Sequence, residues 1–181
     1  MLEKANIQLI KENLFQESEP SIYAVLDGAS VPDLPQVLWE QQPQYACLYR
    51  GKLEPDMAEV APYLVKLEPE SPFTDWVIGQ GWGNHWGIFA VTPKKADLRT
   101  MRQHFRKFLM VLDPEGERMY FRYYDPRVLR VYLPTCNAEE LRALLGPSSS
   151  YLLEEDDASV LLRLAVADGN LATRKTDLPT S

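Results

Sequence analysis

The sequence predicts an α/β (α+β) fold, in which helices flank a mixed central sheet and a β-hairpin lies near the C-terminus. Short apolar runs alternate with segments of helical periodicity along most of the 181 residues, a pattern typical of a sheet covered by helices. Hydrophobic residues make up 45% and charged residues 25% of the chain, as in globular domains. We therefore expect one domain over residues 1–146, followed by a short extension.

Helices and strands alternate in the first half of the chain. Apolar residues at helical spacing predict a helix over residues 2–15, and a second helix is expected over residues 32–42. Ser71 and Pro72 are typical of an N-cap and a first helical position, so a third helix starts there. Four apolar runs bounded by turn residues predict strands: Ile22–Leu26, Tyr45–Tyr49, Tyr63–Leu67 and Trp86–Val91.

The most regular helical pattern begins at Thr92 and Pro93, which suit an N-cap and a first helical turn. An apolar stripe at spacings of three and four residues predicts the face that meets the core: Leu98, Met101, Phe105, Phe108 and Leu112. Arginines at the same spacings predict a basic ridge on another side of this helix: Arg99, Arg102 and Arg106. After a turn at residues 113–116, alternating side chains predict a strand over residues 119–123.

The remainder of the chain contains two helix starts and a hairpin. Asp125 and Pro126 suit an N-cap and a first helical position, and Asn137 with Glu140 forms a capping box for the next helix. Residues 151–153 and 160–166 predict a hairpin within an extension over residues 147–169. Residues 170–181 lack apolar periodicity, and we expect them to be a disordered tail.

Charge is unevenly distributed along the sequence. The net charge is −7, yet residues 93–130 hold 10 basic and 5 acidic side chains. Nucleic-acid binders are more often basic overall, because phosphate contacts supply much of their affinity, so no nucleic-acid partner is expected. The basic block indicates a solvated helix face, an acidic patch on a partner protein, or an internal partner such as the acidic run at residues 154–157.

Compartment signals favour the cytoplasm. Cys47 and Cys136 are too few for a disulfide scaffold, and no export signal is recognisable at the N-terminus. The longest uncharged run, residues 76–93, contains four glycines and several polar residues, which does not suit a helix in contact with lipid. We expect no membrane partner.

The sequence offers no catalytic motif. Residues 79–84 are rich in glycine but lack the third glycine of a dinucleotide-binding fingerprint. Cys47, Cys136, His85 and His104 are not spaced like metal ligands, so neither a metal nor another cofactor is expected. One enzymatic alternative stays open, namely a small hydrolase or transferase that uses His85 and a carboxylate.

The segment Arg118–Arg130 is the most distinctive part of the sequence. It places Arg122, Asp125 and Arg127 at a strand-to-helix junction, with Tyr124 between them. Arginine and tyrosine concentrate binding energy at protein interfaces, but an arginine can also hold Asp125 internally and stabilise the corner. We favour the internal role for Asp125, with Arg122 and Pro126 in the same structural motif. For Tyr124 and Arg127 both interpretations stay open.

Several segments together resemble the effector-adaptor chaperones of bacterial type VI secretion, a family long catalogued as a domain of unknown function. The resemblance covers residues 22–146 and depends most on Phe121–Leu129, with the helix before it in the expected place. The other segments that carry it are Tyr23–Ala29, Ala61–Val65 and Trp86–Phe89.

The resemblance implies a cytoplasmic, non-enzymatic loading factor. Such proteins bind a secreted effector near its N-terminal region or PAAR tip and help to seat it on the VgrG spike. On this hypothesis Trp82, Trp86 and Tyr124 cover apolar side chains of the effector. Arginines would bind its acidic groups: Arg99, Arg102, Arg106 and Arg127. The rival hypotheses are the enzyme based on His85 and a nucleic-acid module that uses the basic ridge.

Overall fold

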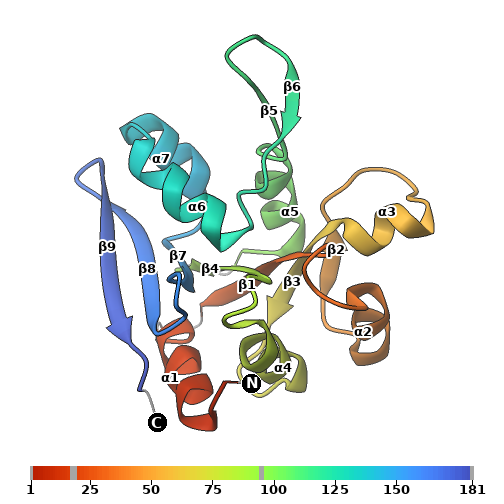
Figure 1. The fold of residues 1–181 in the computed structure, drawn as a ribbon, viewed down its shortest axis with the longest axis vertical. Helices are drawn as coiled ribbons and strands as arrows, with labels where there is room; N and C mark the ends of the chain where they lie inside the picture. Colours follow the sequence, from red (N-terminus) through yellow and green to blue (C-terminus); the bar gives the residue numbers. More distant parts are fainter. Residues whose placement is uncertain (1, 17–19, 94–95, 180–181) are drawn as a thin grey trace.

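The computed structural model describes residues 2–16, 20–93 and 96–179, and it is built on one large sheet (Figure 1). Seven strands lie in the order β2-β3-β1-β4-β7-β8-β9, and every pair is antiparallel. The strands are β1 (Ser21–Asp27), β2 (Tyr45–Cys47), β3 (Pro62–Leu67), β4 (Gly87–Thr92), β7 (Ser150–Glu154), β8 (Val160–Ala167) and β9 (Asn170–Asp177). The predicted class, a sheet flanked by helices with a C-terminal hairpin, is confirmed, but the sheet is antiparallel and not mixed as expected.

Helices cover both faces of this sheet. They are α1 (Lys4–Leu14), α2 (Leu34–Gln41), α3 (Pro55–Val60), α4 (Pro72–Gly81), α5 (Leu98–Arg106), α6 (Pro126–Tyr132), a 3₁₀ turn (Leu133–Thr135) and α7 (Ala138–Leu145). A separate two-stranded hairpin, β5 (Met110–Leu112) and β6 (Arg118–Tyr120), projects from the body next to α5 (Figure 1).

The central strand β1 separates two hydrophobic cores. Ile22, Ala24 and Leu26 face the core formed with α1, α2 and α4, whereas Tyr23 and Val25 face the core formed with α5, α6 and α7. Side chains alternate between the two faces of a strand, so a strand covered on both sides must be apolar at nearly every position. This explains the uninterrupted apolar run of β1, all of which is buried.

Three predicted helix starts are confirmed by their capping contacts. The Ser71 side chain accepts a hydrogen bond from the Phe73 amide at 3.2 Å and caps α4. Asp125 caps α6, and Asn137 with Glu140 forms the predicted capping box of α7. Capping contacts lie within one turn of chain, which is why the sequence alone predicts them well.

The helix predicted from Thr92 to Leu112 is shorter at both ends. Thr92 belongs to β4, where it pairs with Ser21 and its hydroxyl donates to the Ser21 carbonyl at 2.7 Å. Asp97 caps α5 instead, accepting from the Thr100 amide at 2.7 Å. At the other end, Leu112 lies in β5, and the strand expected over residues 119–123 is limited to β6. Pairing within the two sheets overrides the local helical pattern.

The prediction of a disordered tail is wrong for residues 170–177. These residues form β9, which pairs with β8 along its whole length, and Leu178 beyond it is buried. Asp168 and Gly169 make the turn with φ values of 51° and 79°, the conformation that a two-residue hairpin turn requires. Because β9 is an exposed edge strand, its sequence is polar and shows little apolar pattern. The extension therefore continues the main sheet through β7, which pairs with β4.

Candidate functional site

Asp125 is the centre of a polar cluster at the start of α6. Its side chain is buried and accepts a hydrogen bond from the Arg127 amide at 3.0 Å. The Arg127 guanidinium binds the same carboxylate through two contacts, Nε to Oδ1 at 3.0 Å and Nη2 to Oδ2 at 2.7 Å. Burial by itself raises the pKa of Asp125, but the hydrogen bonds and charges of Arg127 and Arg122 outweigh it and hold the pKa below its ordinary value. Asp125 thus has the internal arginine partners that the predicted stabilising role requires.

Arg122 connects this cluster to the end of β1. Its Nη2 donates a hydrogen bond to the Asp27 carboxylate, whose side chain is 1% exposed. The same carboxylate also accepts hydrogen bonds from the Ala29 amide at 3.1 Å and the Ser30 hydroxyl at 3.0 Å. Arg122 Nη2 lies 3.9 Å from Asp125 as well. Two buried carboxylates are thus neutralised by two arginines that are about half exposed, which gives the corner charge balance without removing the guanidinium groups from solvent.

The three aromatic side chains predicted to bind a partner are buried in this structure. Tyr124 is 4% exposed, and burial, with the nearby charge of Asp27, raises the pKa of its hydroxyl. Trp82 donates its indole N–H to the Ala158 carbonyl at 2.9 Å, and the Trp86 ring packs 4.8 Å from the Trp76 ring. The prediction that these residues form an exposed apolar surface is wrong, because contacts far apart in the sequence enclose them.

The predicted basic ridge divides into residues with different environments. Arg106 donates to three backbone carbonyls at the end of β2, those of Cys47 at 3.0 Å, Leu48 at 2.9 Å and Tyr49 at 2.9 Å. Arg102 is half-buried, and Arg99 is exposed. Arg106 therefore has a structural role, and Arg99 is the ridge residue that lies open to solvent.

The acidic run near the C-terminus supplies an internal partner for the basic block. Arg130 of α6 donates to the Glu154 carbonyl at 2.5 Å and forms an ion pair with Asp156. The internal acidic partner predicted for the basic block therefore applies to Arg130. The predicted solvated helix face applies to Arg99, which is exposed.

His85 lies beside a carboxylate, as the enzymatic alternative requires. Its Nδ1 is 2.5 Å from Oε1 of Glu154, and its side chain is 27% exposed. Glu154 is buried and also accepts from the backbone amides of Gly83 and His85. Among the described residues, the Glu154 carboxylate is the charged group that lies against the His85 ring. Through the two backbone amides, Glu154 thus fastens the turn after α4 to the end of β7.

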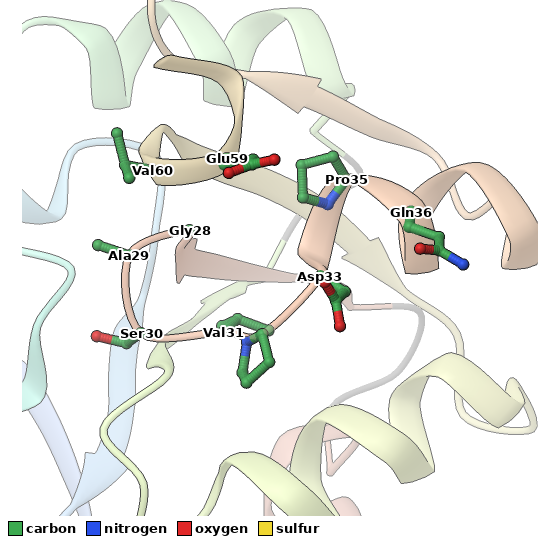
Figure 2. Close-up of a pocket in the computed structure, with 10 residues that line it drawn as sticks. Gly28, Ala29, Ser30, Val31, Asp33, Pro35, Gln36, Glu59 and Val60 are labelled. Atoms are coloured by element: carbon green, nitrogen blue, oxygen red, sulfur yellow. The ribbon is translucent and has the colours of Figure 1, made fainter. Parts of the chain in front are cut away.

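A surface hollow lies between the loop after β1 and the end of α3 (Figure 2). It has a volume of about 470 Å³ and is lined by residues 28–33, Pro35, Gln36, Glu59 and Val60. Gly28 is needed here, because a Cβ at this position would lie 2.4 Å from the Ala61 carbonyl oxygen. The charged side chains that line the hollow, Asp33 and Glu59, are both acidic and exposed. The hollow is consequently not suited to an anionic ligand.

Two features are absent from the described residues. No helix among them is both long and apolar enough to cross a bilayer. No three histidine, cysteine, aspartate or glutamate side chains among them are grouped as metal ligands would be.

Two features of this site were difficult to predict from the sequence. Asp27 and Glu154 are buried carboxylates at the ends of apolar strands, which is an unusual position for an acid. An acid in that position indicates that its carboxylate pairs with a donor or cation, but the sequence does not indicate which residue that is.

Comparison with known proteins identifies a family. A family model described as a domain of unknown function (DUF4123) matches residues 22–143, whereas neither a curated protein nor a solved structure matches. The matched range runs from β1 to α7 and includes the whole cluster around Asp125. Since it covers well over half of the 181 residues, this chain belongs to the DUF4123 family.

Proposed function

We propose that this protein is a cytoplasmic adaptor chaperone that binds a secreted effector of type VI secretion and promotes its loading onto the VgrG/PAAR spike. Membership of the DUF4123 family supports the proposal, because the matched residues contain the segment Phe121–Leu129 on which the resemblance to these adaptors depends. An adaptor acts by binding another polypeptide, so it needs an exposed apolar surface more than an enclosed pocket.

The observation that carries this proposal is the exposure of the β5–β6 hairpin, which projects beyond the sheet and helices (Figure 1). Four large apolar side chains of the hairpin are 42–67% exposed: Met110, Leu112, Met119 and Tyr120. Grouped apolar side chains on the surface of a soluble protein mark interaction sites. A two-stranded hairpin is also only marginally stable by itself, so a bound partner would stabilise it.

This surface replaces the aromatic part of the mechanism expected from the sequence. The hairpin side chains, and not Trp82, Trp86 or Tyr124, would cover apolar residues of the effector. Arg99 and Arg127 remain candidates for binding the acidic groups of the effector. Arg99 is exposed, and the Arg127 side chain is 53% exposed although it pairs with Asp125.

Co-expression tests the proposal directly. The full chain carrying an affinity tag is expressed with the effector encoded beside its gene, and the purified material is examined for a complex of defined stoichiometry. A stable complex, together with loss of effector loading onto the spike when the adaptor gene is deleted, is expected. Loading that proceeds unchanged in the deletion strain would refute the proposal.

A further inference from the structure

We propose that the groove at the base of the β5–β6 hairpin binds a segment of the effector in which apolar side chains are flanked by acidic ones. This inference rests on the proposed function and specifies the partner's chemistry. The groove has a volume of about 390 Å³ and is lined by Leu48, Tyr49, Arg50, Leu53, Met57, Arg106, Leu109, Met110 and Tyr120. We call it the hairpin groove.

Strand register places an apolar face of the hairpin above the groove. Met110 pairs with Tyr120, and Leu112 pairs with Arg118, so these four side chains share one face of the two-stranded sheet. Met110 and Tyr120 line the groove, and the Tyr120 ring lies 5.9 Å from the Tyr49 ring. The exposed apolar surface therefore continues from the hairpin into the groove.

The opposite wall of the groove is held in place by Arg106. Its three hydrogen bonds to the carbonyls of residues 47–49 fix the chain that follows β2 against α5. Beyond this chain, Met57 of α3 is 43% exposed and completes the apolar lining. Methionine adapts its shape to different side chains, so a wall that contains Met57 and Met110 suits an irregular peptide segment.

Among the described residues, no acidic side chain pairs with the arginines at this site. Desolvation lowers the pKa of Arg106, and the positive charges of Arg102 and Arg50 lower it further. The three guanidinium groups therefore lie close enough to repel one another. None of the three forms an ion pair with a described residue. The buried Nε of Arg102 also has no hydrogen-bond partner among the described residues. Carboxylates of a bound segment would relieve this repulsion.

Charge also orients the bound segment. Among the described residues, the groove lining contains two arginines and no acidic side chain. The tip of the hairpin, in contrast, carries Asp113, Glu115 and Glu117. The acidic residues of the segment would therefore lie at the base of the groove near Arg50 and Arg102, and its apolar residues would lie against Met110, Leu112 and Tyr120 (Figure 1 shows the hairpin above α5).

A peptide-binding assay on the full chain tests this assignment. The probe is a synthetic amphipathic helix with leucines on one face and glutamates on the other, and the same helix with lysines in place of glutamates is the charge control. We expect the glutamate helix to bind and the lysine helix to bind at least tenfold more weakly. Equal affinity of the two helices, or no binding of the glutamate helix, would overturn the inference.

Paired substitutions locate the site. Leu112→Ser and Arg50→Glu should each weaken binding of the glutamate helix by about tenfold or more, as loss of a central contact does. Val131→Ser on α6, where Val131 is 73% exposed, and Arg174→Glu on β9 at the opposite edge of the sheet are matched controls and should bind as the wild type does. Circular dichroism verifies that all four variants fold. Equal loss in the controls would overturn the assignment to this groove.

Different outcomes distinguish failure of the groove assignment from failure of the proposed adaptor function. If the neighbouring effector co-purifies with Leu112→Ser as well as with the wild type, the groove is not its docking site, but the adaptor function stands. If the peptide binds and no effector loading depends on this protein, the adaptor proposal fails while the chemistry of the groove is retained. A concentration-dependent dimer that Leu112→Ser abolishes would show that a second copy of the chain occupies the groove, which would also overturn the inference.

Discussion

Arg122 donates a hydrogen bond from Nη2 to Oδ2 of Asp27, a residue 95 positions earlier in the sequence. Asp27 ends the central strand β1, and Arg122 precedes the N-cap of α6. The contact thus joins the middle of the sheet to the chain that leaves the hairpin. A buried carboxylate requires such partners, because an unpaired charge in the interior is strongly destabilising.

Asp27→Asn should lower the free energy of unfolding by about 1–3 kcal/mol, because it removes a charge-assisted hydrogen bond from a buried site. Urea denaturation of the wild type, Asp27→Asn, Arg122→Gln and the double variant measures the effect. We expect the double variant to be less destabilised than the sum of the single ones. Additive losses would show that the two residues are not coupled.

Glu154→Gln should also destabilise the protein, by about 1–3 kcal/mol. The carboxylate accepts from two backbone amides of the turn after α4 and lies against His85, and an amide in its place would direct hydrogens at a backbone N–H. Glu155→Gln is the matched control, since Glu155 is more exposed and pairs with exposed Lys175. Exposed pairs contribute little. A comparable shift in the thermal midpoint of both variants would contradict the structural role given to Glu154.

Stability should decrease as the pH falls below about 6.5, through the titration of His104. Desolvation by burial lowers the pKa of His104, although the hydrogen bond from its Nε2 to the Leu144 carbonyl at 2.9 Å opposes the shift. Below pH 6.5 the unfolded chain therefore binds a proton at His104 more readily than the folded chain does. The free energy of unfolding consequently rises with pH up to about 6.5, the ordinary pKa of histidine. His104→Gln should reduce this slope in urea titrations between pH 5 and 7. An unchanged slope would show that another group causes it.

Removal of β9 should be strongly destabilising, although its sequence reads as a tail. A chain that ends at Asp168 loses the pairing along β8 and the burial of Leu178, and it leaves β8 as an open edge that can pair with other molecules. We expect a lower thermal midpoint and a smaller soluble fraction than for the full chain. A Gly169→Val variant, which keeps every residue but strains a turn with φ of 79°, should move both quantities in the same direction. Truncation without effect on either quantity would contradict the role of β9.

Local signals in the sequence were reliable where the contact they describe is itself local. The capping residues Ser71, Asp125 and Asn137 begin the helices that they predict. The dipeptide Asp168-Gly169 carries an equally local hairpin signal, which predicts β9 in spite of the polar composition of residues 170–177.

The sequence by itself determined the alternation of strands and helices, the capping of α4, α6 and α7, and the internal role of Asp125, because each depends on residues within a few positions of one another. Only the tertiary structure decided that Trp82 and Tyr124 are buried, that Asp27 meets Arg122, and that the apolar surface lies on the β5–β6 hairpin. A side chain is buried or exposed according to what packs over it, and in a sheet of this topology the covering residues come from distant parts of the chain.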